Sequence, residues 1–334
     1  MLSSSSSMII RTLIVLALAM TFAGQCRGDA RDLQVGFYKN KCLLADVEAI
    51  VGNVVADWKK NNDSAIAAAL LRMQFHDCFV DGCDASILLD GENSEKKAGP
   101  NLSVRGYELI DAAKAKVEEI CPGVVSCADI IVMATRDAVA LSGGEKYSVQ
   151  TGRRDGTTSL AKNVNLPGPT ISVSDCLKLF SKNKIDATTA IYLLGGHTVG
   201  IAHCSFFMDR LYNFSSTGKP DPNMDPILLT QLRARCPQKA TFDNTANLDQ
   251  DSTSFNTVDE SYYNQIVAKR GVLPIDQNLA LDPLSKSTVE TIASSSDFGK
   301  KFGEAMVKLG AVGVLTGKEG QIRRRCRSVN LLPF

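Results

Sequence analysis

Residues 71–86 read Leu71-Arg72-Met73-Gln74-Phe75-His76-Asp77-Cys78-Phe79-Val80-Asp81-Gly82-Cys83-Asp84-Ala85-Ser86, and the rest of the chain is organised around them. The residues just before it, 65–71, are rich in alanine and leucine, which favour a helix. If that helix continues to His76, then Arg72 and His76 lie four residues apart on one face. A fixed cation beside a titratable base predicts a site for a small polar molecule that carries protons.

The bulk composition indicates an ordinary globular protein. The chain has 334 residues, of which 44% are hydrophobic and 22% are charged, so it is long enough for one large domain or two small ones. Its formal net charge is +1. This charge gives no reason to expect a nucleic acid or an anionic membrane as partner.

The first thirty residues have the pattern of a secretory signal peptide. Arg11 precedes an apolar run over residues 13–23, and the small residues Gly28 and Ala30 follow. We therefore expect residues 1–30 to be removed after Ala30. A membrane anchor is the weaker interpretation, because the apolar run is too short to span a bilayer.

The cysteine content supports export. Of ten cysteines, Cys26 would leave with the signal peptide, and the odd number of nine would remain. An oxidising compartment favours disulfides, with one cysteine left over. Spacing leaves the pairing open, apart from a small loop between Cys78 and Cys83.

Apolar periodicity predicts a mainly α fold. Strand-like alternation is rare and short, and no internal repeat is apparent. Loops are expected over residues 77–100, 145–170 and 215–258. Besides the helix that carries His76, helices are expected over residues 47–60, 109–120, 126–141, 173–180, 186–195, 204–214, 262–269, 287–294 and 298–309.

The chain has only three histidines, His76, His197 and His203. They are too few for a histidine-rich zinc site, and the chain lacks the Gly-x-Ser-x-Gly turn of a serine hydrolase. His197 is surrounded by three glycines, which would allow a large flat group to approach the backbone. Taken alone, however, a histidine between apolar residues is more often an ordinary core residue.

Two motifs resemble those of the secreted plant haem peroxidases (class III). Residues 72–86 are similar to the distal motif of that family, and Gly195-Gly196-His197-Thr198-x-Gly200 is similar to its proximal motif. Further matches lie at residues 125–130, 152–155, 209–214 and 320–326. The resemblance implies the haem-peroxidase fold, with haem b between two helical layers. It also implies one domain over residues 31–334, with a distal part at about 31–150, a proximal part at about 160–310 and a C-terminal segment that returns to the distal part.

On the distal side, the resemblance implies that His76 is the acid–base residue for hydrogen peroxide. Arg72 would stabilise the charge that develops as the O–O bond breaks. Asn101 would accept a hydrogen bond from His76 and fix its tautomer. Glu95 is expected to be the supporting acid of Asn101.

On the proximal side, the resemblance implies that His197 is the axial ligand of the haem iron. Asp276 would accept a hydrogen bond from the other ring nitrogen of His197. Phe75 is expected to contact the haem. Pro167 and Phe206 are expected to line the exposed haem edge, where donors bind.

Two calcium ions are also implied. The first would use hard oxygen ligands beside the distal helix, from Asp77, Val80, Gly82, Asp84 and Ser86. The second would use Thr198, Asp251, Ser254 and Asp259, with the carbonyl of Thr257. The sequence departs from the family pattern at the second site, so Asp249 and Thr253 remain alternatives to Asp251 and Ser254.

The resemblance further implies which cysteines pair. Cys176 would remain a free thiol. Asp129 would form a buried structural ion pair with Arg153 or Arg154. The implied disulfides are Cys42–Cys121, Cys78–Cys83, Cys127–Cys326 and Cys204–Cys236.

The function implied is a secreted peroxidase that reduces hydrogen peroxide and oxidises small phenolic donors one electron at a time. Peroxide removal, lignin-type wall oxidation and a stress response are the implied roles. We expect a glycosylated monomer in the extracellular space or cell wall rather than the vacuole. Asn62 and Asn213 are the expected glycan sites, since Asn101 is needed elsewhere.

Two other functions remain in competition. A haem- and calcium-holding scaffold without turnover is disfavoured by the complete set of expected catalytic residues. An intracellular peroxidase of the ascorbate or cytochrome c type is disfavoured by the signal peptide and the cysteines. The single tryptophan, Trp58, also lies far from any proximal position.

Overall fold

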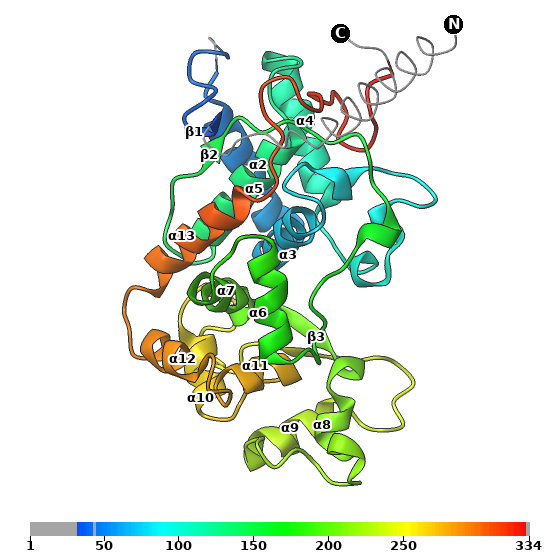
Figure 1. Cartoon of the computed structure of the whole chain (residues 1–334), viewed down its shortest axis with the longest axis vertical. Coiled ribbons are helices and arrows are strands. Elements are labelled where there is room, and N and C mark those ends of the chain that lie inside the picture. The colour runs from blue at the N-terminus through cyan, green and yellow to red at the C-terminus, as the bar shows by residue number, and fades with distance from the viewer. Residues whose placement is uncertain (1–31, 43–44, 332–334) are drawn as a thin grey trace, which may run out of the picture.

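The computed structural model describes residues 32–42 and 45–331, and the predicted signal peptide lies outside this range. The described chain is mainly helical, as expected (Figure 1). None of its helices is long and apolar enough to cross a membrane. The α-helices are α2 (Val47–Asn61), α3 (Ile66–Phe79), α4 (Tyr107–Ile120), α5 (Cys127–Leu141), α6 (Val173–Lys182), α7 (Ala187–Leu194), α8 (Met208–Tyr212), α9 (Pro226–Arg235), α10 (Ser261–Val267), α11 (Pro274–Leu279), α12 (Lys286–Ala293) and α13 (Phe298–Gly310).

Two short antiparallel pairs account for the strands of the described residues. β1 (Gln34–Val35) pairs with β2 (Gln150–Thr151), and β3 (Ile201–His203) pairs with β4 (Thr245–Asn247). Each pair joins segments far apart in the chain. The strands therefore form two separate two-stranded sheets, each of which joins connecting segments of the chain.

Helix α3 lies between two hydrophobic cores. Leu70 and Met73 belong to the core formed with α2, α4 and α5, whereas Leu71 and Phe79 belong to the core formed with α6, α7 and α10–α13. In Figure 1, α2, α4 and α5 occupy the upper part and α6, α7 and α10–α12 the lower part, with α13 between them. A helix that is apolar around most of its surface is buried on several sides. The Arg72–His76 helix is therefore held by both halves of the molecule.

The expected helix over residues 204–214 is wrong. The segment begins with a 3₁₀ turn, η7 (Cys204–Phe206), and becomes helical only in α8. The backbone N–H of Cys204 donates to the carbonyl of Asn244 at 2.8 Å, so the chain still follows the β3–β4 pair at this point. A tertiary contact thus overrides the local helical pattern.

The expected loop over residues 215–258 contains helix α9. Asp225 caps this helix, since its side chain accepts a hydrogen bond from the N–H of Leu228 at 2.9 Å. Pro226 occupies the first turn, where a missing N–H costs nothing. Asp225 and Pro226 were not recognised as a helix start, because the residues around the helix are polar and typical of a loop. Helix α11 is a second helix that periodicity did not predict.

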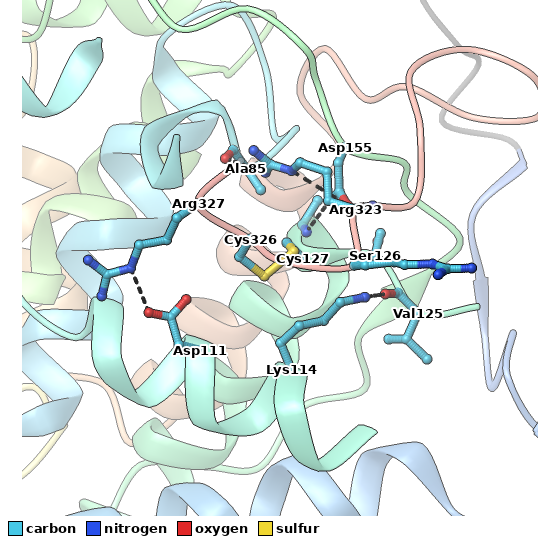
Figure 2. Close-up of a disulfide and its surroundings, with 12 residues drawn as sticks. Ala85, Asp111, Lys114, Val125, Ser126, Cys127, Asp155, Arg323, Cys326 and Arg327 are labelled. Atoms are coloured by element: carbon cyan, nitrogen blue, oxygen red, sulfur yellow. Dashed lines mark hydrogen bonds and ion pairs between the residues drawn. A yellow bond between two sulfur atoms is a disulfide. The ribbon is translucent and has the colours of Figure 1, made fainter. Parts of the chain in front are cut away.

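The C-terminal segment returns to the first core (Figure 2). Arg323 is fully buried, and its Nη2 donates to the carbonyl of Ala85 at 2.6 Å. Asp155 accepts a hydrogen bond from the N–H of Arg323 at 2.9 Å. Cys326 closes a disulfide with Cys127, 199 residues earlier. Residues 323–326 thus lie against the core that contains α2, α4 and α5.

The disulfides are the four expected pairs, and Cys176 is a buried free thiol. The buried ion pair of Asp129 is formed with Arg153, with 2.8 Å between Oδ1 and Nη1. Arg153 also donates twice to the carbonyl of Gly310, at 2.8 and 2.6 Å. This arginine therefore joins α5 to the end of α13.

Candidate active site

The distal base and its orienting amide come from α3 and the 3₁₀ turn η4 (Gly99–Asn101). Nδ1 of His76 is 2.6 Å from Oδ1 of Asn101. The amide nitrogen of Asn101 donates to the carbonyl of Glu95 at 2.9 Å, which leaves Oδ1 to accept. Nδ1 of His76 therefore carries the proton, and Nε2 holds the lone pair, which accepts a hydrogen bond from Arg72.

Glu95 supports Asn101 differently from our prediction. Its backbone carbonyl, and not its carboxyl group, accepts the hydrogen bond from Asn101. The Glu95 side chain is buried, and burial raises its pKa to about 8, with the nearby Asp84 and Asp81 charges adding to the rise. Glu95 thus lies beside Asn101 as expected, but it supports Asn101 through its main-chain carbonyl.

Arg72 donates from Nε to Nε2 of His76 at 3.2 Å. Its Nη2 donates to the carbonyl of Pro100 at 2.8 Å, and its Nη1 donates to Oγ of Ser103 at 3.0 Å. The guanidinium is therefore held beside the base by one short loop. Pro100 and Ser103 are contacts that the sequence analysis missed, because they depend on how residues 99–103 fold.

His76 is neutral at ordinary pH. Its pKa is lowered to about 4, mainly by burial and also by the charge of Arg72, whereas the hydrogen bond with Asn101 opposes both. A neutral imidazole with an accessible lone pair is what a proton acceptor requires.

The proximal histidine lies in the 3₁₀ turn η6 (Gly195–Thr198), which packs against α3. Nδ1 of His197 is 2.8 Å from Oδ1 of Asp276, a fully buried residue in the first turn of α11. Burial lowers the pKa of His197, but the charge and hydrogen bond of Asp276 outweigh this and raise it. The charge of Arg72 also acts to lower the pKa of His197.

The proximal residues fit the haem that the resemblance implies. Asp276 fixes the proton of His197 on Nδ1, and within the described residues Nε2 has no hydrogen-bonding partner. The side chain is 34% exposed, so this nitrogen is available as a ligand. Gly196 also has open space where a Cβ would lie, which permits close approach to the backbone.

Tyr262 is a further proximal contact. Its hydroxyl donates to Oδ1 of Asp276 at 2.9 Å, the same oxygen that accepts from His197. The sequence analysis placed Tyr262 only in an amphipathic helix. A Tyr-Tyr pair inside an apolar stripe gives no signal of a polar contact.

Phe75 and the two residues expected at the donor edge come from three different segments of the chain. Phe75 packs with Phe79 and Phe180, at 4.7 and 5.8 Å between ring centroids. Pro167 is half-buried in the connection before α6, and this segment is anchored beside Asp276, because the carbonyl of Pro169 accepts from the N–H of Ile275 at 3.0 Å. Phe206 is 48% exposed after β3.

The first expected calcium site gathers buried oxygen atoms beside α3. Asp77 is buried and accepts from the backbone N–H groups of Ala85 and Ile87 at 3.0 and 3.3 Å. Burial raises the pKa of Asp77, and the charge of Asp84 raises it further. The Ser86 hydroxyl is buried without a well-formed hydrogen bond. These unneutralised oxygens fit a hard cation.

The loop at this site is closed tightly. The Cys78–Cys83 disulfide joins its ends, and Gly82 has a φ of +119°. A Cβ at Gly82 would lie 2.2 Å from the carbonyl oxygen of Gly313. Only glycine fits this approach, so the carbonyls expected from Val80 and Gly82 are held in a fixed backbone.

The second expected site is partly assembled. Oγ1 of Thr198 is 3.3 Å from Oδ1 of Asp259 and 3.2 Å from the carbonyl of Thr257. Thr253 is exposed, and its hydroxyl donates a hydrogen bond to Asp251. The Ser254 hydroxyl, in contrast, is buried without a well-formed hydrogen bond. This favours Ser254 over Thr253.

Asp249 is the remaining alternative at this site. Its Oδ2 is buried without a partner, and burial raises its pKa to about 6. Among the described residues no cluster holds three or more metal-ligating His, Cys, Asp or Glu side chains. Both expected sites therefore depend on hydroxyl and carbonyl oxygens as well as carboxylates.

Comparison with known proteins gives one consistent family. The model of the family described as Peroxidase matches residues 51–295. The chain is 51% identical to Peroxidase 60 of Arabidopsis thaliana over 322 residues, which cover 96% of each chain. It is 52% identical to Peroxidase 57 of the same plant over 299 residues, which cover 89% of this chain and 93% of that protein. It is 50% identical to Peroxidase 44 over 321 residues, which cover 95% and 99%.

Proposed function

The chain belongs to the peroxidase family and uses hydrogen peroxide to oxidise donor molecules, and we propose that it is a secreted, class III enzyme that oxidises small phenols. Membership of the family implies haem and typically calcium. When bound, haem supplies the redox-active iron to which electrons from the donors pass one at a time. We also propose that residues 31–334 form one domain with a distal and a proximal part.

Each distal residue would have its own role in the cleavage of hydrogen peroxide. Nε2 of His76 accepts a proton from one oxygen of hydrogen peroxide and returns it to the other oxygen as the O–O bond breaks. Arg72 lies one hydrogen bond away and stabilises the negative charge on the departing oxygen. Asn101 keeps the ring in the tautomer that makes this transfer possible. One observation carries the proposal: Nδ1 of His76 is held by Asn101 while Nε2 faces the Arg72 cation.

The proximal residues would hold the haem from the other side. His197 would supply Nε2 as a ligand of the haem iron, and the hydrogen bond to Asp276 would increase the basicity of the ring. Phe75 would contact the haem, and Pro167 and Phe206 would line the donor edge. The anchoring of residues 166–169 next to Asp276 supports this placement of the edge.

Calcium would tie the distal helix to its loop and the proximal histidine to the segment after β4. We propose ligands from Asp77, Val80, Gly82, Asp84 and Ser86 for the first ion, and from Thr198, Asp251, Ser254 and Asp259 for the second. The protein would act as a monomer in the extracellular space or cell wall, in peroxide removal, phenolic wall oxidation and the stress response.

The test is the reaction of the haem-loaded protein with peroxide. The purified chain should show a Soret band that changes on addition of hydrogen peroxide. His76→Ala should keep the band and slow the change by about 10²–10⁴-fold, the usual contribution of a general acid–base group. His203→Ala is the matched control, because His203 is exposed at the end of β3 and outside the distal group. Equal rates for both variants would exclude His76 as the base.

A further inference from the structure

We propose that Tyr262 is a positioning residue of the proximal site, which limits how much negative charge Asp276 passes to His197. The inference rests on the proposed function, since it concerns His197 as a haem ligand. It goes beyond that function because it assigns a role to a residue outside the expected histidine–carboxylate pair.

The geometry is a shared oxygen. Oδ1 of Asp276 accepts from Nδ1 of His197 at 2.8 Å and from the hydroxyl of Tyr262 at 2.9 Å. Tyr262 is 1% exposed and Asp276 is fully buried. The rings of Tyr262 and His197 are nearly perpendicular, with centroids 6.2 Å apart. The two donors therefore approach one carboxylate oxygen from different directions in a dry environment.

A carboxylate oxygen with two donors divides its charge between them. The other oxygen of Asp276, Oδ2, is buried and has no hydrogen-bonding partner within the described chain. Hydrogen bonds to an ionised group are strong, and a low local dielectric strengthens them further. A phenol with an ordinary pKa near 10 remains a donor at neutral pH. The bond from Tyr262 thus reduces the basicity of Asp276 and keeps His197 closer to a neutral imidazole.

The next residue provides a matched control. Tyr263 is 0% exposed, lies on the same helix and also makes one short hydrogen bond. Its hydroxyl donates to the backbone carbonyl of Ile191 at 2.7 Å, and not to Asp276. Tyr262→Phe and Tyr263→Phe therefore remove the same group from equally buried places, and only the first changes the carboxylate.

The test measures the iron–histidine bond in the haem-loaded protein. Tyr262→Phe should raise the iron–histidine stretching frequency of the ferrous protein in resonance Raman spectra. It should also make the ferric–ferrous midpoint potential more negative, because His197 gains imidazolate character. Tyr263→Phe should leave both quantities at the parent value. Unchanged values for Tyr262→Phe, or equal shifts in the two variants, would overturn the inference.

A second substitution reverses the expected sign. A 3-fluorotyrosine in place of Tyr262 keeps the ring and hydroxyl but is a stronger donor, so it should lower the stretching frequency and make the potential less negative. A higher stretching frequency or a more negative potential in the fluorotyrosine protein would overturn the inference. This second test does not need the phenylalanine variant to keep its haem. If the parent chain shows no Soret band, the proposed function fails and this inference with it. If the parent is normal and the variants match it, only this inference fails.

Discussion

Replacing Asn101 with aspartate should move the acid limit of the peroxide reaction from near pH 4 to near pH 7. Nδ1 of His76 lies 2.6 Å from Oδ1 of Asn101. A carboxylate in that place would put a negative charge about 4 Å from the centre of a protonated imidazole. At an effective dielectric constant of about 20, the attraction is about 4 kcal/mol.

This attraction has a definite effect on the pKa of His76. At 1.36 kcal/mol per pKa unit, about 4 kcal/mol corresponds to about 3 units. The pKa would rise from about 4 in the parent to about 7 in the variant. A protonated His76 is unable to accept a proton, so the variant should lose activity as the pH falls through about 7, and the parent only as it falls through about 4.

The assay is the rate of the Soret change after rapid mixing with hydrogen peroxide, measured across the pH range. Asn62→Asp is the control, because Asn62 is exposed at the end of α2 and its change adds the same charge. The reasoning is refuted if the acid limit of Asn101→Asp stays near that of the parent. It is also refuted if the control variant shifts by the same amount.

Three further predictions concern stability, calcium and modification. Removing the Cys127–Cys326 disulfide by two serine substitutions should lower the free energy of unfolding by up to about 5 kcal/mol, the loop-entropy value for so long a loop; denaturant titration that shows no loss would contradict this. Chelation of calcium should lower the melting temperature of the parent more than that of Asp84→Asn, and equal losses in calorimetry would exclude Asp84 as a ligand. On the secreted protein, mass spectrometry should find a glycan on exposed Asn62 and none on Asn101, which is 2% exposed; a glycan on Asn101 would refute its role beside His76.

The distal half of the site was predictable because its key signal is local. Arg72 and His76 lie on one helix, and the spacing of four residues places them together whatever the rest of the chain does. The periodic helices α2, α4 and α5 were likewise predicted close to their observed bounds. Local spacing and apolar periodicity are properties that the sequence states directly.

The proximal half depends on contacts between distant segments. His197 and Asp276 are 79 residues apart, and only the resemblance to a family brought them together before the structure was known. The contact of Tyr262 with Asp276 was not predicted, because it depends on how α10 packs near α11. Glu95 was assigned to the correct place but to the wrong atoms, since a sequence does not show whether the main chain or the side chain faces inward.

The Cys127–Cys326 bond also has a consequence for biosynthesis. Ribosomes add about 5–20 residues per second, so the thiol of Cys127 waits roughly 10–40 s for its partner to be made. During that time Ala85 also lacks its contact with Arg323, so the loop that follows α3 is not yet held at this point. A nascent chain stopped before Cys326 should therefore react at Cys127 with a thiol label, whereas the released chain should not. This order of assembly would leave the loop after α3 and the start of α5 without these two contacts until Arg323 and Cys326 have been synthesised.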